Sequence, residues 1–367
     1  MRSRPGAAHT SPNPQYRAIP AHSGIANDCK GDHMRASVND VAKRAGVSVS
    51  TVSRAFTRPE LVSERTRKKV LQVADELNFS VSRSAVALKR GQTFRIALLA
   101  GGHIDWFSAR ILEGLNSVLH DTGYDFSIYA ITHDEERARF FEQLPVRRNA
   151  DAIIVSSFNL SPDETDRLHA MGIPIVGINA VSPGEFDASI SIDDTAAIQI
   201  LVRHLVALGH RRIAYLYEES ISPLRFSSHQ RVTGFTQLCD ELDGVTGTAI
   251  AVRHGDDCAN VAITTLLSQP DPPTAICVHQ DSWAIPLFFR LPRYGIRIPD
   301  DLSVTGFDDS DFAEEVGLTT VRQLPRDMAA TAARMALDLI NGRTPEHRHI
   351  TAPVQLMLRS STAAPRA

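Results

Sequence analysis

A stretch of six residues in the sequence contains five side chains that can contact nucleic-acid bases. They are Val49, Ser50, Thr51, Ser53 and Arg54. An arginine can donate two parallel hydrogen bonds to O6 and N7 of guanine, and a valine can contact the methyl group of thymine. Serine and threonine hydroxyls can bond to base edges or to phosphates. If these residues share one face of a helix, that helix could read bases in the major groove of DNA.

The flanking residues predict two helices joined by a tight turn. Ser37 to Asp40 has the form of a capping box, and Ser48 can cap the second helix. Gly46 stands where the chain must bend sharply, with the positive φ that glycine adopts at little cost. This geometry leaves Val49, Ser50, Ser53 and Arg54 pointing outwards, although a plain helical hairpin explains the same pattern. The apolar positions facing the interior are Val41, Ala42, Ala45, Val52, Ala55 and Phe56.

A third helix is predicted after Ser63, and it closes an all-α helix-turn-helix headpiece over residues 36–80. Its polar face is basic and either contacts phosphates or is simply solvated. Residues 81–92 then predict a hinge helix of barely two turns. Because isolated helices this short are marginal in water, we expect a partner or DNA to order it.

The charge is divided sharply along the chain. Residues 34–95 contain 13 basic and 5 acidic residues, a net charge of +8, and the segment after residue 95 carries 22 basic and 35 acidic residues, or −13. A basic head on an acidic body is the electrostatic pattern of a nucleic-acid binder whose larger part has another task.

Composition excludes several classes of protein. Hydrophobic residues make up 43% of the 367 residues, but no apolar run reaches the roughly 18 residues of a membrane span. The N-terminus does not resemble a secretory signal, and residues 1–35 are predicted to be a disordered extension. The widely spaced Cys29, Cys239, Cys258 and Cys277 indicate thiols in a reducing cytoplasm, with no metal site or cofactor. We therefore expect a cytoplasmic, nucleoid-associated protein.

From residue 95 onward, apolar strands alternate with amphipathic helices, which is typical of parallel sheets covered by helices. Two series of strands predict two doubly wound lobes within 93–367, one formed by 94–193 plus 322–345 and the other by 194–321 plus 346–361. Ligands of such sheets bind outside the carboxyl ends of the strands. The predicted strands are 96–100, 125–130, 152–156, 175–178, 189–192, 213–216, 248–252, 275–278, 303–307 and 319–322.

Nearly the whole chain after Ser37 resembles the LacI/GalR family of transcription regulators. In the headpiece the resemblance rests on Asp40-Val41-Ala42, Ala45-Gly46-Val47-Ser48 and Thr51-Val52-Ser53-Arg54. In the body it rests on four motifs in the family's order, 207–214, 298–304, 306–309 and 318–323. The resemblance implies a headpiece followed by a two-lobed, periplasmic-binding-protein-like effector domain. It also implies a homodimer that binds an inverted-repeat operator, most often as a repressor, under the control of a sugar-like small molecule.

The resemblance also assigns site residues. Val49, Ser50 and Arg54 take the base-reading positions. Leu88 matches the hinge leucine that is inserted into the minor groove, and packing against its dimer mate is an alternative role that does not exclude the first. The implied effector residues are Trp106, Phe107, Asn179, Arg231, Gln280 and Asp308, with Trp283 as a weaker candidate. A purely structural interpretation stays open, with the aromatics in the core and Arg231 bonded to Asp308 across an empty cleft.

Two other classes of protein share parts of this pattern. A periplasmic solute-binding protein would have the two lobes but needs a signal peptide and would lack the basic headpiece. A Rossmann-type enzyme would share the alternation of strands and helices. The sequence contains no GxGxxG that opens a helix after a strand, no GxxxxGK[ST], no GxSxG and no HExxH. We therefore expect a regulator that is not an enzyme.

Overall fold

The computed structural model describes residues 36–79, 92–101, 105–157, 159–180, 186–219, 226–253 and 255–366. The chain divides into two compact units, residues 1–82 and 83–367. The predicted disordered segment 1–35 lies outside the described residues, as does the hinge prediction as far as residue 91, including Leu88. Within the described ranges, no helix combines the length and apolar character needed to cross a membrane.

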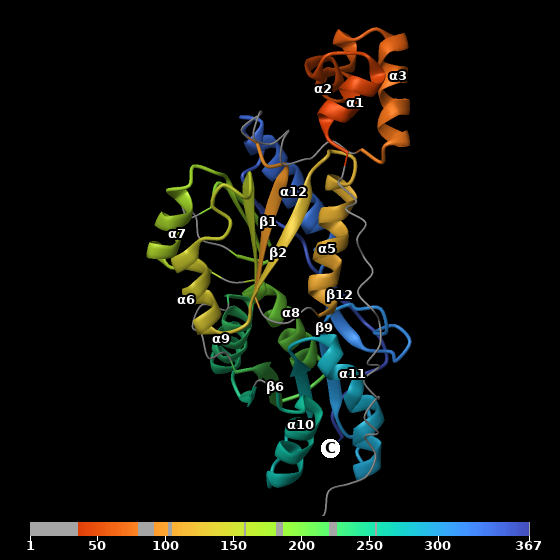
Figure 1. The fold of residues 1–367 in the computed structure, drawn as a ribbon. Helices are drawn as coiled ribbons and strands as arrows, with labels where there is room; N and C mark the ends of the chain where they lie inside the picture. Colours follow the sequence, from red (N-terminus) through yellow and green to blue (C-terminus); the bar gives the residue numbers. More distant parts are fainter. Residues whose placement is uncertain are drawn as a thin grey trace, which may run out of the picture. The chain divides into compact units, whose positions relative to one another are not determined.

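The first unit contains the three predicted headpiece helices (Figure 1). They are α1 (Val38–Ala45), α2 (Val49–Thr57) and α3 (Glu64–Glu76), with a short 3-10 turn at Pro59–Leu61. The capping box is confirmed, because Ser37 N donates to Asp40 Oδ2 over 2.8 Å and Asp40 N donates to Ser37 Oγ over 3.3 Å. Ser48 and Ser63 cap the next two helices as predicted.

The turn and the core of the headpiece also match the prediction. Gly46 ends α1 with a φ of 67°, and its N–H bonds back to the last turn of the helix. The three helices bury one small apolar cluster and leave the start of α2 outside it. The buried members of that cluster are Val41, Ala42, Ala45, Val52, Ala55, Val70, Val73 and Ala74.

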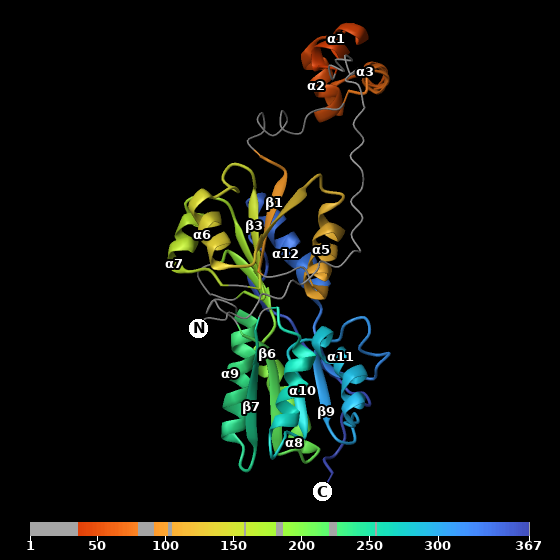
Figure 2. The ribbon, with the colours of Figure 1, turned by 60° about the horizontal axis from the view of Figure 1, so that its bottom comes forward.

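The second unit is built on two six-stranded sheets, one in each lobe (Figure 2). The first sheet has the order β11-β5-β4-β3-β1-β2, and the second has the order β12-β10-β9-β8-β6-β7. All neighbouring strands are parallel except β12, which runs antiparallel to β10. The first-lobe strands are β1 (Arg95–Gly101), β2 (Asp125–Ile131), β3 (Ala152–Ser156), β4 (Ile175–Ile178), β5 (Ala188–Ser191) and β11 (His349–Thr351). The second-lobe strands are β6 (Arg212–Glu218), β7 (Thr246–Val252), β8 (Ala275–Val278), β9 (Ser303–Asp308), β10 (Thr319–Arg322) and β12 (Gln355–Met357).

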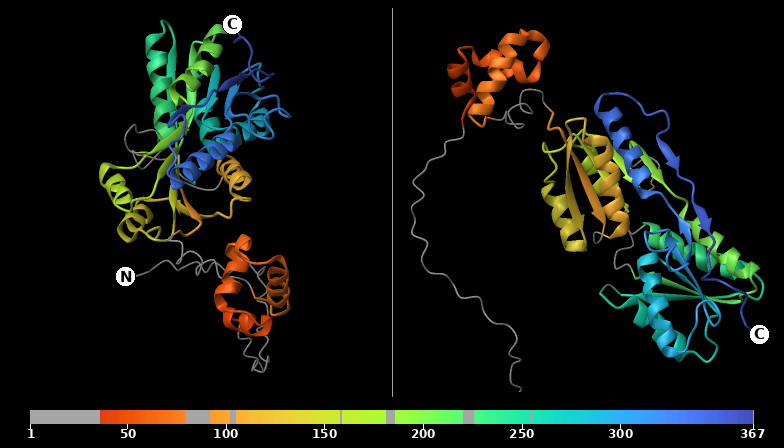
Figure 3. Two further views of the ribbon diagram at one scale, coloured as in Figure 1. Left: turned by 90° about the horizontal axis from the view of Figure 1, so that it is seen from above. Right: turned by 90° about the vertical axis from the view of Figure 1, so that its right-hand side faces the viewer.

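Helices cover both faces of each sheet (Figure 3). One continuous apolar cluster lies under α5 and α12 in the first lobe and under α8 and α9 in the second, so it joins the two lobes. Separate clusters lie under α6 and α7 and under α10 and α11. The helices are α5 (Trp106–Leu119), α6 (Asp134–Gln143), α7 (Pro162–His169), α8 (Asp194–Ala207), α9 (Phe226–Glu241), α10 (Cys258–Ser268), α11 (Asp281–Arg290) and α12 (Pro325–Ile340), with a 3-10 turn at Leu291–Tyr294.

The structure confirms the ten predicted strands and adds two short ones. The prediction placed the whole of 346–361 in the second lobe, and this is wrong for β11, which pairs with β5 in the first sheet. The chain therefore crosses between the lobes after β5, after β10 and again between β11 and β12. A three-residue edge strand carries almost no apolar period of its own, so its neighbour decides where it pairs.

The closest helix packing in the first lobe depends on Gly114. A Cβ atom at this position of α5 would collide with the carbonyl oxygen of Arg326 and would lie 2.7 Å from Cβ of Ala329 in α12. The helix has no room for a larger residue there unless the two helices separate.

Gly114→Ala should therefore lower the free energy of unfolding by about 1–3 kcal/mol, because a well-packed contact is overfilled. Thermal and urea unfolding of the full chain measure the effect. Asn116→Ala, on the exposed face of the same helix, is the control and should leave the midpoint nearly unchanged. Equal midpoints for wild type and Gly114→Ala would contradict this account of the packing.

Candidate functional site

The exposed surface of α2 presents the side chains predicted to contact DNA. Val49 is 42% exposed, Ser50 and Arg54 are exposed, and Thr51 and Ser53 are half-buried. Arg54 forms no ion pair with any residue in the described part of the headpiece. Its guanidinium is thus available for a bidentate contact to a base.

The hydroxyls at the start of α2 are bonded to one another. Ser48 Oγ lies 2.8 Å from Ser50 Oγ and 2.9 Å from Thr51 Oγ1, and it also accepts a hydrogen bond from Thr51 N. The cap therefore fixes the Ser50 and Thr51 hydroxyls in position. Val49, Ser53 and Arg54 are left as the predicted side chains that take no part in the cap.

In the second unit, a cleft lies between the lobes at the carboxyl ends of their strands, as expected for doubly wound sheets. The first lobe lines it with Gly101, Asp105, Phe107, Ser108, Ser157 and Asn179. The second lobe contributes Glu218, Ser227, Ser228, Arg231, His279, Gln280 and Asp308. Gln323, on the crossing segment after β10, completes the lining. A ligand here would touch both lobes at once.

Five of the six predicted effector residues meet in this cleft: Phe107, Asn179, Arg231, Gln280 and Asp308. They come from α5, β4, α9, α11 and β9 or from the residues that flank these elements. The topology brings them together because strand ends of both sheets face each other across the same gap.

Trp106, the sixth, does not line the cleft. Its indole lies below the guanidinium of Arg110, with 5.6 Å between the guanidinium carbon and the ring centre. Arg110 in turn pairs with Asp311 of the second lobe, so Trp106 supports an ion pair that joins the lobes. The weaker candidate Trp283 is half-buried against the second-lobe core and likewise does not line the cleft.

Arg231 is held by three groups. Its Nε lies 2.6 Å from Asp194 Oδ1, and its Nη1 donates to the carbonyl oxygen of His279 over 3.0 Å. The guanidinium carbon lies 3.5 Å from the centre of the Phe307 ring. Burial alone would lower the pKa of Arg231, but the Asp194 carboxylate and other nearby acidic groups outweigh it and raise the pKa. The predicted alternative of an Arg231–Asp308 salt bridge is therefore replaced by an Arg231–Asp194 pair.

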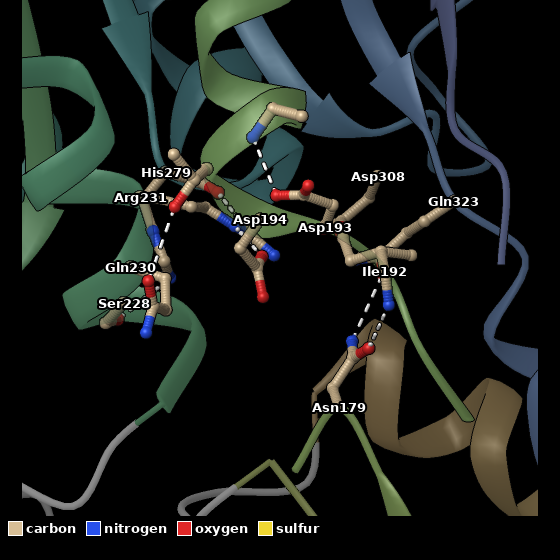
Figure 4. A network of polar contacts seen from close by, with 12 residues as sticks. Asn179, Ile192, Asp193, Asp194, Ser228, Gln230, Arg231, His279, Asp308 and Gln323 are labelled. Atoms are coloured by element: carbon tan, nitrogen blue, oxygen red, sulfur yellow. Dashed lines mark hydrogen bonds and ion pairs between the residues drawn. The ribbon is translucent and has the colours of Figure 1, made fainter. Parts of the chain in front are cut away.

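A chain of hydrogen bonds crosses the other side of the cleft (Figure 4). Gln323 Nε2 donates to Asp308 Oδ1 over 2.7 Å, and Asn179 Nδ2 donates to Gln323 Oε1 over 3.4 Å. Asn179 Oδ1 accepts from the backbone N–H of Ile192 over 3.1 Å. Asn179 belongs to the first lobe and Asp308 to the second, with Gln323 and Ile192 on crossing segments. The orientation of Asp308 is thus linked to the first lobe through Gln323.

Asp308 lies in an unusually acidic and enclosed environment. Burial and the nearby Asp281 carboxyl raise the pKa of Asp308 well above its ordinary range, although Arg231 and Gln323 oppose the shift. Burial likewise raises the pKa of Asp281 to about 6, even though Asp281 accepts bonds from Thr320 Oγ1 and from Ser310 N. A hydrogen-bond donor that reached Asp308 would favour its charged form and compensate for its burial.

Several residues that line the cleft have a strained backbone conformation. Ser157, Asn179 and Asp308 have φ values of 67°, 45° and 118°, in the left-handed region that residues other than glycine rarely adopt. Each lies at or just after the carboxyl end of a strand, and all three line the cleft. Strained residues cluster at ligand sites because the surrounding structure must fix them there.

Several cleft residues were not predicted from the sequence. Asp194, Ser228, His279 and Gln323 are polar groups of the site or its immediate support, yet none belongs to a recognisable spacing pattern. A positional signal existed for His279 and Gln323, each of which directly follows a predicted strand. Among the residues that the structure describes, no cluster of His, Cys, Asp and Glu could hold a metal ion.

The buried ion pair makes a prediction about stability. Arg231→Met should lower the free energy of unfolding by about 3–5 kcal/mol, because it leaves the Asp194 carboxylate buried without its partner. Arg231→Met combined with Asp194→Asn should recover part of this loss. Urea unfolding measures both, with the exposed Arg203→Met as control. Equal stability of the single and double variants would rule out the ion pair as the cause.

Comparison with known proteins agrees with both units. Residues 37–82 match the family described as bacterial regulatory proteins, lacI family, and residues 202–362 match the periplasmic binding protein-like domain. The chain is 27% identical to the HTH-type transcriptional repressor CytR of Escherichia coli strain K12, over 91% of this chain and 98% of CytR. It is 29% identical to the HTH-type transcriptional repressor PurR of Vibrio vulnificus strain CMCP6, over 89% and 98%.

Among solved structures, the lac repressor dimer bound to operator and the anti-inducer ONPF superimposes with a TM-score of 0.76 at 25% identity. The match covers 90% of this chain and 99% of the lac repressor chain. The match of the headpiece, the match of the body and the similarity to relatives over nearly their whole length agree with one another. The chain has a LacI-family helix-turn-helix domain followed by a periplasmic-binding-protein-like domain, and over nearly its whole length it is similar to LacI-family transcriptional repressors.

Proposed function

We propose that this protein binds an inverted-repeat operator as a homodimer and that a sugar-like small molecule in the cleft controls its affinity for DNA. The observation that carries the proposal is the cleft itself, in which polar side chains of both lobes converge at strained strand ends. The lac repressor, to which the chain is similar, is a dimer bound to operator and to an anti-inducer. We place the protein in the cytoplasm, at the nucleoid.

The cleft favours a neutral ligand that is rich in hydroxyl groups. Arg231 is already paired with Asp194, so a carboxylate or phosphate would have to compete with that ion pair. Asp308 and Asn179 offer acceptor oxygens to hydroxyl or ring N–H groups. Phe107 supplies an apolar surface on which a ring could lie. These groups support a sugar-like effector better than an anionic one.

Control of DNA binding follows from the position of the cleft. A ligand that bonds to both lobes favours one relative orientation of the two, and it shifts the equilibrium only through its different affinity for the two states. The Asp308–Gln323–Asn179 chain and the Arg110–Asp311 ion pair would differ between those states, because each joins the lobes. Couplings of this kind are typically worth about 1–3 kcal/mol.

Arg54→Ala should weaken binding to the preferred operator by about 1–3 kcal/mol and relax selectivity at one base-pair position, because it removes a bidentate base contact. Fluorescence anisotropy on operator variants, selected first from random DNA, measures both effects. Lys43→Ala, an exposed residue of α1, is the control and should leave base selectivity unchanged. Equal losses on operator and random DNA would make Arg54 a phosphate contact only.

Asp308→Ala should leave operator binding largely intact and abolish the effector response, because it removes the buried acceptor from the cleft. Operator binding is titrated with a panel of sugars and nucleosides for wild type and variant. Asp271→Ala, an exposed carboxylate of the second lobe, is the control. An unchanged response to the effector would remove Asp308 from the ligand site.

A further inference from the structure

A row of three hydrogen-bonding side chains ends at the cleft. The Tyr215 hydroxyl lies 2.9 Å from His279 Nδ1, and His279 Nε2 lies 3.2 Å from Ser228 Oγ. Tyr215 is fully buried, whereas His279 and Ser228 line the cleft (Figure 4). The row therefore runs from the core of the second lobe to the wall that a ligand would touch.

The hydrogen bonds in this row have one consistent direction. Burial raises the pKa of Tyr215 far above its ordinary value, so the phenol keeps its proton. In the described part of the lobe, His279 Nδ1 is the hydrogen-bond partner of that phenol, so Tyr215 must donate and Nδ1 must accept. The neutral imidazole then carries its proton on Nε2 and donates it to Ser228 Oγ. Ser228, whose oxygen accepts this bond, is left with its own proton directed to the cleft.

The row is also fixed in place. The Tyr215 ring packs between Tyr217 and Phe235, with ring centres 6.0 and 5.3 Å away. The backbone carbonyl oxygen of His279 accepts a hydrogen bond from Arg231, and the backbone N–H of His279 donates to the carbonyl oxygen of Leu216. The aromatic neighbours hold the Tyr215 ring and the backbone bonds hold the main chain of His279, so the direction of the bonds is set before a ligand arrives.

We propose that Tyr215 and His279 act as positioning residues that make the Ser228 hydroxyl a hydrogen-bond donor, so that the effector must present an acceptor atom at this wall. A carbonyl oxygen, a ring nitrogen or an ether or hydroxyl oxygen meets that requirement. An ammonium or amide N–H group facing Ser228 would leave the proton of the hydroxyl without an acceptor. The inference rests on the proposed effector function of the cleft and specifies the chemistry of one of its walls.

The first test is the protonation state of His279. Long-range proton–nitrogen NMR spectra of the full chain, labelled with nitrogen-15 histidine, distinguish the two neutral forms of the ring, and His279→Asn identifies the signals. We expect the Nε2–H form at neutral pH. The Nδ1–H form or a doubly protonated ring would overturn the proposal.

The second test uses ligand affinity, with ribose, cellobiose and uridine as probes. For any probe that binds the wild type, Ser228→Ala should weaken binding about two- to tenfold, as expected for the loss of one neutral hydrogen bond. In His279→Asn the asparagine side chain still offers an acceptor to Tyr215 but is too short to reach Ser228. This variant should weaken binding of the same probe, with little change in thermal stability. Ser282→Ala, an exposed residue of α11, is the matched control and should have no effect.

The outcomes separate the two proposals. Unchanged affinity in Ser228→Ala for a probe that binds the wild type would overturn the role of Ser228. Failure of every probe to bind the wild type would count against the proposed sugar-like effector. In that case the form of the His279 ring decides the inference alone, since Nε2–H supports it and Nδ1–H overturns it.

Discussion

The structure of the cleft depends on one buried ion pair, between Arg231 of α9 and Asp194 of α8. Two charges removed from water are tolerated only when each is closely paired, and here the side chains are 5% and 1% exposed with 2.6 Å between them. Because Arg231 also bonds to the His279 carbonyl and lies over Phe307, the pair ties two helices to two strand ends of the second lobe. The wall of the cleft is rigid for this reason.

The first-lobe side of the cleft is held in a different way. Among the described residues, its links across the gap include amide contacts through Gln323 and an ion pair at the surface, Arg110 with Asp311. Such contacts are weaker than a buried ion pair and can be exchanged for contacts to a ligand. A rigid second-lobe wall beside an exchangeable set of bonds between the lobes is suited to a switch. The continuous apolar cluster across both lobes limits how far they can move apart.

The headpiece uses local interactions almost alone. Its helices begin at serine caps, its turn needs one glycine with positive φ, and its core consists of small aliphatic residues. The acidic body and the basic head share one chain, so the body contributes little attraction to DNA and the head provides the contacts.

The amino-acid sequence by itself determined the features with a local cause. Capping serines, Gly46 and apolar periods depend on neighbouring residues, so the headpiece and the ten main strands could be predicted. Five of the six effector residues implied by the family resemblance also meet in the cleft. Tertiary structure decided what depends on partners distant in the chain. It paired Arg231 with Asp194 rather than with Asp308, placed Trp106 under an ion pair and assigned β11 to the first lobe. It also determines which ring nitrogen of His279 carries the proton, because the hydrogen bonds of a polar side chain inside the protein are set by whichever groups the fold brings within reach.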